Sequence, residues 1–170
     1  SVTGGKERIR YFLEKYQPAL PQLDDLDGFI AGLHQRKTHF YTDALKRGAI
    51  PMRPGVLRLI QEARDAGLVL GIATTTTPEN VSALLEAGIG PQALDWFGVI
   101  AAGDVVPAKK PAPDIYTYAM EKLGLTPDVC AALEDSGHGV HAAADAGIDT
   151  VVVTVNGYTR EQDFSAATLG

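Results

Sequence analysis

Short apolar runs alternate with amphipathic helical patterns over the larger part of this chain. The periodicity predicts strands over 68–73, 98–102, 131–133 and 150–155, and helices over 56–66, 78–87, 114–123 and 139–146. A glycine follows each of these helices directly, which is a common signal for a helix end. Strands that alternate with helices pair in parallel through right-handed crossovers, so the pattern predicts an α/β fold with a Rossmann-like parallel sheet.

The first part of the chain differs, because its apolar residues recur at helical spacing without any strand between them. One apolar set runs from Ile9 to Tyr16, and a second lies between Phe29 and Leu45. The proline-containing segment 50–55 then predicts an extended linker. We therefore predict a small helical cap in residues 1–50 and the α/β core in residues 51–170.

Composition indicates a folded protein and narrows its partners. The 170 residues are 45% hydrophobic, and their net charge of −6 with no long basic run argues against binding to nucleic acid or an anionic membrane. No apolar run approaches the roughly 20 residues of a membrane-spanning helix. Cys130 is the only cysteine in the sequence, which indicates a reducing compartment. We expect a cytoplasmic monomer, although a targeting segment could precede Ser1.

Three polar stretches lie where the predicted strands end or the following helices begin. Residues 74–77 are all threonine, Lys109 and Lys110 open a proline-stiffened loop, and Glu134 and Asp135 end a strand. The carboxyl ends of parallel strands share one edge of a sheet, so these groups are expected to meet there. Hydroxyls at a helix start suit a phosphate, a held lysine neutralises phosphoryl oxygens, and paired carboxylates suit Mg²⁺. Together they predict magnesium-assisted phosphoryl transfer.

Each stretch also has an ordinary structural interpretation. The threonines could be helix N-caps, the two lysines a solvated pair, and the two carboxylates part of a surface turn. The occurrence of all three on successive strands of one sheet favours the chemical interpretation.

The same residues resemble motifs of the haloacid dehalogenase-like hydrolases, in the branch that contains β-phosphoglucomutase and the CbbY phosphatases. Thr74, Lys110 with the Pro-Ala-Pro-Asp that follows it, and the segment Leu133-Glu134-Asp135-Ser136 are similar to the second, third and fourth motifs. Segments 4–9, 101–106 and 157–159 resemble the CbbY subgroup more closely. The resemblance spans essentially the whole chain.

The resemblance implies a role for each motif. Thr74 and Lys110 would be the catalytic residues that bind the phosphoryl group being transferred, and Glu134 and Asp135 would hold Mg²⁺ directly or through water. Gly5, Lys6 and Arg8 would lie in the cap and bind the far end of the substrate. Lys37, also in the cap, would face the substrate, and Thr75 and Thr76 of the core would bind it as well. In the CbbY subgroup the far end is the second phosphate of a pentulose bisphosphate such as xylulose-1,5-bisphosphate.

The first motif of the family, Asp-x-Asp-Gly-Thr at the end of a central strand, has no counterpart here. Asp25-Leu26-Asp27-Gly28 has similar letters, but the preceding segment 18–22 contains two prolines and is not a buried strand, so we interpret it as a helix start. We therefore expect the chain to begin inside the cap, with the first strand and its nucleophilic Asp upstream of Ser1. In the family that strand lies between the strands that end at Thr74 and Leu133.

The sequence thus predicts a magnesium-dependent phosphatase that hydrolyses a phosphorylated sugar through an aspartyl-phosphate on the upstream Asp. Two alternatives remain open. A sugar phosphomutase would share every motif, and a catalytically inactive fragment would account for the missing nucleophile.

Overall fold

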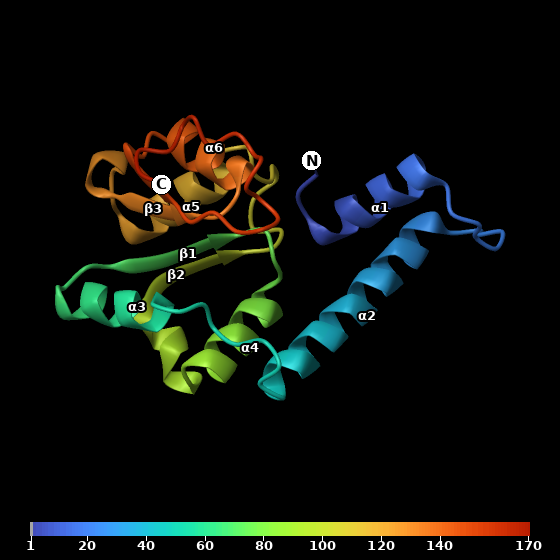
Figure 1. Cartoon of the computed structure of the whole chain (residues 1–170), viewed down its shortest axis with the longest axis horizontal. Helices are drawn as coiled ribbons and strands as arrows, with labels where there is room; N and C mark the ends of the chain where they lie inside the picture. Colours follow the sequence, from blue (N-terminus) through green and yellow to red (C-terminus); the bar gives the residue numbers. More distant parts are fainter. Residues whose placement is uncertain (1) are drawn as a thin grey trace. The chain divides into compact units, whose positions relative to one another are not determined.

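The computed structural model describes residues 2–170, which form two compact units (Figure 1). The first unit comprises residues up to Leu70 together with Thr76–Phe97, and the second comprises Gly71–Thr75 together with Gly98–Gly170. The division into a cap of residues 1–50 and a core of residues 51–170 stays a prediction.

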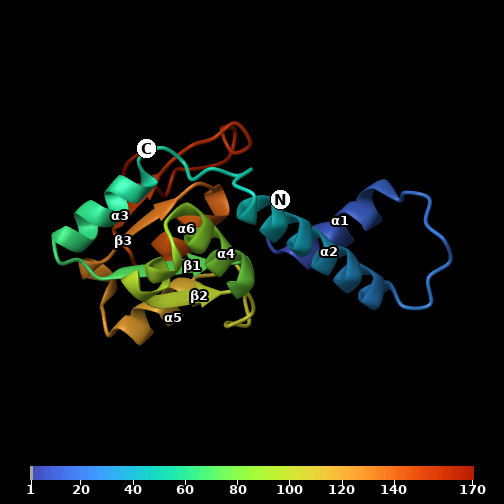
Figure 2. The same ribbon diagram turned by 90° about the horizontal axis from the view of Figure 1, so that it is seen from below.

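The first unit is helical. Its elements are α1 (Gly5–Tyr16), α2 (Leu26–Lys46), α3 (Val56–Asp65), α4 (Pro78–Gly88) and the 3₁₀-helix η1 (Pro91–Trp96). Helices α1 and α2 form an antiparallel hairpin, which Figures 1 and 2 both show, and α2 also contacts α4. The Asp25 carboxylate accepts a hydrogen bond from the Gly28 amide at 2.8 Å and so caps α2. Asp25 is thus a helix start, as the sequence indicated.

The apolar stripe of α1 is exposed within its unit. No residue of this helix is buried, and Phe12 and Tyr16 are 52% and 60% exposed. Their rings contact each other, with centroids 5.0 Å apart. Helical periodicity therefore predicted the secondary structure of α1 correctly, but an amphipathic face is buried only where a partner surface covers it.

The second unit contains the parallel strands. Its elements are β1 (Leu70–Thr74), β2 (Phe97–Ala102), α5 (Asp114–Leu123), the 3₁₀-helix η2 (Pro127–Val129), β3 (Ala131–Glu134), α6 (Gly137–Asp145) and β4 (Thr150–Val153). Strand β3 pairs in parallel with β4, with Ala131 opposite Thr150, and β1 pairs with β2. Helix α6 contacts β3, β4 and α5. The observed elements agree with the predicted ones to within a few residues, and the α/β fold is confirmed.

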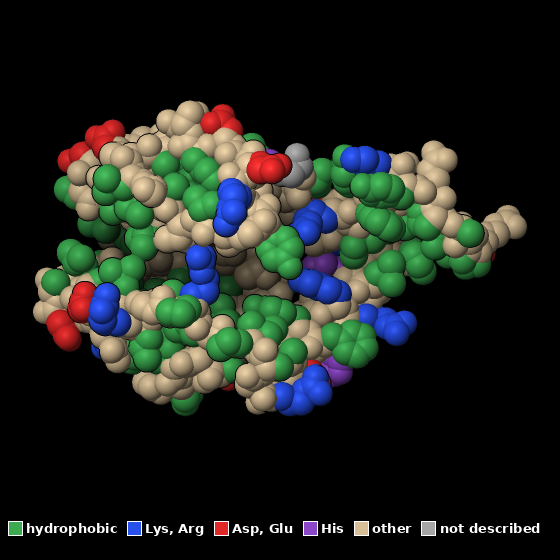
Figure 3. All heavy atoms as spheres, in the orientation of Figure 1, with side chains coloured by type: hydrophobic (Ala, Val, Ile, Leu, Met, Phe, Trp, Pro, Cys, Tyr) green, Lys and Arg blue, Asp and Glu red, His purple; other side chains and the backbone are tan. Residues whose placement is uncertain are grey.

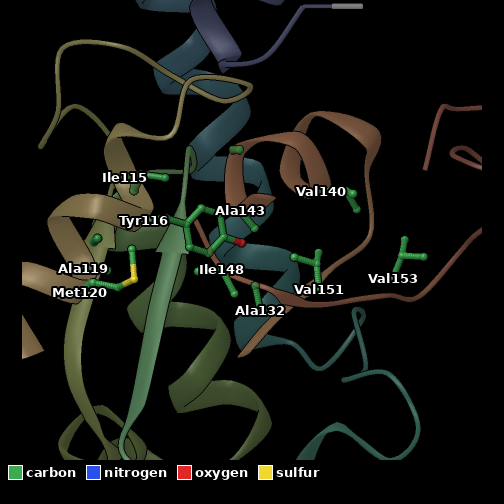
Figure 4. Packing of buried hydrophobic residues seen from close by; sticks show 12 residues of the cluster. Ile115, Tyr116, Ala119, Met120, Ala132, Val140, Ala143, Ile148, Val151 and Val153 are labelled. Carbon is green, nitrogen blue, oxygen red and sulfur yellow. The ribbon is translucent and has the colours of Figure 1, made fainter. Parts of the chain in front are cut away.

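The core of the second unit lies where α5 and α6 meet the strands (Figure 4). Ile115 of α5, Val140 of α6 and Val151 of β4 are each at most 1% exposed. Alanines on both helices, including Ala119 and Ala143, let the backbones approach closely. This packing holds the carboxyl ends of the strands, where the predicted site residues lie.

Strand pairing is interrupted between β1 and β3. The strands form two separate two-stranded sheets, β1–β2 and β3–β4. Leu133 of β3 is 56% exposed although it lies within a strand. The interruption falls where the family resemblance assigns a further strand, between those ending at Thr74 and Leu133.

Among residues 2–170, every helix is too short or too polar to cross a membrane. On the face drawn in Figure 3, Lys and Arg side chains (blue) are separated by apolar and neutral surface. The absence of a nucleic-acid or membrane partner stays a prediction.

The buried β4 valine provides a test of this core. Val151 is fully buried, whereas Val129 is 65% exposed in the same unit. Val151→Ala should lower the free energy of unfolding by about 2 kcal/mol, because it removes buried methyl groups and leaves a cavity. Val129→Ala, which removes the same atoms, should change it by less than about 0.5 kcal/mol. Urea titration measures both, and equal losses would contradict the assigned core.

Candidate active site

Lys110 is a buried charged residue, with 8% of the whole residue exposed. It lies in the loop between β2 and α5. Its ammonium group donates a hydrogen bond to the Ala73 carbonyl of β1 at 2.9 Å and another to Oε1 of Glu134, the last residue of β3. A buried cation is tolerated only when it is paired in this way. Lys110 therefore joins the carboxyl ends of two strands that belong to different sheets.

The Glu134 carboxylate is enclosed by donors and backbone, and its side chain is 9% exposed. Oε1 accepts hydrogen bonds from both the Lys110 ammonium and the Tyr116 hydroxyl. The carboxylate also lies against the backbone of Gly139 in the first turn of α6, where an added Cβ would overlap it. Glu134 is thus confined between α5, α6 and the lysine loop.

Tyr116 is a third member of this network. It is 9% exposed on α5, and the Lys110 nitrogen lies 4.7 Å from the centroid of its ring. Burial first, and the Glu134 carboxylate second, raise the pKa of the Tyr116 hydroxyl far above its usual value. The hydroxyl is therefore protonated at neutral pH and donates to Glu134.

Asp135 differs from its neighbour because it is exposed. Oδ2 of Asp135 lies 3.4 Å from the Asn156 side-chain amide, beyond the end of β4. Among residues 2–170, no three His, Cys, Asp or Glu side chains are grouped so that they could hold a metal ion by themselves. Mg²⁺ prefers about six oxygen ligands and usually takes only one or two carboxylates plus water and substrate oxygens. The accessible Asp135 carboxylate fits such a partial donor set.

The four threonines divide between the two units. Thr74 ends β1 directly after Ala73, whose carbonyl accepts the Lys110 hydrogen bond, and Thr75 follows it. Thr77 caps α4 by accepting from the Asn80 amide at 3.4 Å, and the Thr76 hydroxyl accepts from the Asn80 side chain at 2.9 Å. Thr77 thus has the N-cap role, whereas Thr74 adjoins the lysine network.

The cap residues singled out from the sequence lie on α1 and α2 of the first unit. Gly5 begins α1, and Lys6 and Arg8 are exposed in its first turn. A Cβ on Gly5 would overlap the His34 imidazole of α2, so glycine permits the close approach of the two helices. The Lys37 nitrogen lies 5.5 Å from the centroid of the Tyr41 ring. The first turn of α1 also contains Glu7, whose carboxylate lies beside Gly4.

Sequence reasoning missed three residues of the site. Tyr116 occupies an ordinary apolar position of the α5 pattern, and its hydroxyl gave no separate signal. Gly139 marked only the predicted start of a helix, and Asn156 lies outside every motif used. Hydrogen-bond partners that lie 18 to 21 residues away in the chain, as for Tyr116 and Asn156, leave no local pattern.

Comparison with known proteins gives a consistent family assignment. A family model described as haloacid dehalogenase-like hydrolase matches residues 4–147. The chain is 43% identical to "Protein CbbY, plasmid" of Cupriavidus necator, with 99% of this chain and 66% of the relative covered. It is 47% identical to CbbY of Rhodobacter capsulatus, with 98% and 70% covered. The chain thus spans about two thirds of the length of these relatives.

Solved structures agree with the sequence matches. A variant of CbbY from Rhodobacter sphaeroides in complex with xylulose-(1,5)bisphosphate superposes with a TM-score of 0.87 at 43% identity, covering 99% of this chain and 72% of that one. A putative β-phosphoglucomutase from Thermotoga maritima gives a TM-score of 0.69 at 27% identity, covering 94% and 71%.

The contact between Gly139 and Glu134 makes a prediction about stability. Gly139→Ala should lower the free energy of unfolding by about 1–3 kcal/mol, because the new methyl group overlaps a carboxylate that two donors hold in place. The control is Gly32→Ala on α2, where an added Cβ meets nothing within 4 Å. That change should stabilise by up to about 1 kcal/mol through helix propensity. Equal effects in the two variants, measured by urea titration, would show that Glu134 is free to move.

Proposed function

Because this chain belongs to the haloacid dehalogenase-like hydrolases, we propose that the protein is a magnesium-dependent phosphatase that acts on a phosphorylated sugar. The observation that carries the proposal is the buried Lys110 ammonium, held by Glu134 and the Ala73 carbonyl next to Thr74. A cation held in place at the ends of parallel strands is suited to neutralise a phosphoryl group as charge redistributes during transfer.

The roles of the chain's own residues follow from their chemistry. Lys110 binds the nonbridging phosphoryl oxygens, the Thr74 hydroxyl donates a hydrogen bond to one of them, and Thr75 and Thr76 bind the same end of the substrate. Glu134 holds Lys110 in place. Asp135 contributes a carboxylate oxygen to Mg²⁺, with Glu134 contributing directly or through water. Bound Mg²⁺ offsets the repulsion between an anionic nucleophile and the phosphate.

None of the residues named above is the nucleophile. We propose an Asp in a segment upstream of this chain, on a strand between β1 and β3, which attacks phosphorus to form an aspartyl-phosphate. The bond between phosphorus and the sugar oxygen breaks, and the sugar leaves as an alcohol after its oxygen takes up a proton. Water then hydrolyses the aspartyl-phosphate to inorganic phosphate and regenerates the Asp. The interruption of strand pairing at that place supports this assignment. So does the length of the CbbY relatives, of which this chain covers 66% and 70%.

The substrate that we propose is a pentulose bisphosphate such as xylulose-1,5-bisphosphate. Support comes from the similarity to a CbbY structure that contains xylulose-(1,5)bisphosphate. Lys6 and Arg8 lie exposed in the first turn of α1, where cations and backbone amides together suit a second phosphate. Gly5 leaves room for close approach, and Lys37 adds a further positive charge. Binding energy from this remote phosphate would orient the reacting end.

A sugar phosphomutase is the second candidate, favoured by the likeness to the putative β-phosphoglucomutase structure. The two reactions differ in whether water or a sugar hydroxyl accepts the phosphoryl group. Assay of the protein expressed from its complete reading frame separates them, since inorganic phosphate is released only by the phosphatase. If neither phosphate nor an isomer forms, the chain belongs to a catalytically inactive protein.

Asp135 provides the test of the magnesium role. In the complete protein, Asp135→Asn should lower the rate of phosphate release by about a hundredfold, because a metal ligand loses its charge. Chelation of Mg²⁺ should abolish the activity, and its return should restore it. The matched control is Asp145→Asn, an exposed acid at the end of α6, which should retain full activity. Unchanged turnover in Asp135→Asn would remove this residue from the metal site.

Lys6 provides the test of the remote phosphate. Lys6→Met should raise KM for a sugar bisphosphate by about tenfold, because one charge-assisted hydrogen bond is lost. KM for the matching monophosphate should stay unchanged. Lys15→Met, at the other end of the same helix, serves as the control. An equal change in KM for both substrates would place Lys6 outside the second phosphate site.

A further inference from the structure

We propose that Tyr116 is a positioning residue of this site, which acts on the reaction through Glu134 and Lys110. The effect of Tyr116 on the reaction rests on the proposed function. Its effect on the positions of Glu134 and Lys110 rests on the hydrogen-bond network alone.

The hydrogen bonds of this network meet at one oxygen atom, Oε1 of Glu134. Oε1 of Glu134 accepts from the Tyr116 hydroxyl and from the Lys110 ammonium, and that ammonium also lies 4.7 Å from the Tyr116 ring centroid. Tyr116 thus contacts both members of the ion pair, one through its hydroxyl and the other through its ring. The side chains of Lys110 and Glu134 are 10% and 9% exposed, so water provides few substitute donors.

This arrangement selects one orientation of the carboxylate. With Oε1 held by two donors and Gly139 on its other side, Glu134 cannot rotate without losing a charge-assisted hydrogen bond or overlapping the backbone of α6. The Lys110 nitrogen is consequently held between the ends of β1 and β3. Displacement of a catalytic cation by even 1 Å can cost a large part of the rate.

The same orientation gives the adjacent carboxylates of Glu134 and Asp135 different roles. Oε1 of Glu134 already accepts two internal hydrogen bonds, whereas Asp135 is exposed and its Oδ2 lies 3.4 Å from the Asn156 amide. Tyr116 thereby holds Oε1 of Glu134 toward Lys110, and Asp135 presents the more accessible carboxylate to a cation.

A merely structural tyrosine makes a different prediction. If Tyr116 only filled the core, its ring would matter and its hydroxyl would not, since the ring alone packs against the apolar residues of the cluster. Tyr116→Phe keeps the ring and removes the hydroxyl. Tyr118→Phe removes a hydroxyl from the same helix outside the network and is the matched control.

The first measurement is the kinetics of the complete protein with a sugar phosphate and Mg²⁺. Tyr116→Phe should lower kcat by about tenfold, with KM changed by less than about twofold, because the substrate still binds but the cation is less well held. Tyr118→Phe should match the wild type. Equal kcat values for Tyr116→Phe and Tyr118→Phe would overturn the proposal.

The second measurement does not depend on activity. In the wild-type background, Tyr116→Phe should lower Tm by about 5 °C. In a Glu134→Ala background the hydrogen-bond partner of Tyr116 is missing, so Tyr116→Phe should lower Tm there by no more than the control Tyr118→Phe does. The same loss of Tm in both backgrounds would overturn the proposal. If Glu134→Ala fails to fold, Glu134→Gln replaces it, and a smaller loss than in the wild type is expected because the acceptor is neutral. If the wild type releases no phosphate, the proposed function fails and this cycle alone decides the role of Tyr116.

Discussion

The ion pair between Lys110 and Glu134 is the interaction on which the arrangement of the site depends. Both side chains are about nine-tenths buried, and removal of one member of such a pair typically costs about 3–5 kcal/mol because the other charge stays buried. The lysine loop is thereby tied to the end of β3 and, through the Ala73 carbonyl, to the end of β1. The ammonium group to which we assign a role in phosphoryl transfer thus also connects the two pairs of strands.

The core of the second unit explains why this pair can be buried at all. Helices α5 and α6 cover β3 and β4 with small and branched apolar side chains, and Tyr116 places a hydroxyl at the edge of that cluster. The tyrosine donates to a carboxylate that is largely shielded from water, so the apolar packing and the polar network support each other. Gly139 completes the enclosure because only a residue without Cβ fits against the carboxylate.

Helix α1 of the first unit differs from the buried core of the second unit. It buries none of its side chains and has exposed charged residues in its first turn. Its described contacts are with α2, and Gly5 permits the close approach to His34. The hairpin carries candidate groups for a remote part of the substrate on α1, while its buried side chains, Ile30 and Leu45, belong to α2. In the proposed function, the exposed first turn of α1 is the candidate site for the second phosphate.

The sequence by itself determined the order, type and approximate bounds of the helices and strands, since periodicity, N-caps and glycine stops are local signals. It also identified Thr74, Lys110, Glu134 and Asp135 as groups at the ends of strands, because strand ends can be located from the same signals. Only the tertiary structure decided that Lys110 is buried against Glu134 while Asp135 stays exposed, and that Tyr116 and Gly139 enclose the pair. The contacts of Lys110 and Tyr116 with Glu134 join residues far apart in the chain, and their geometry depends on how helices and strands pack, which no local pattern encodes.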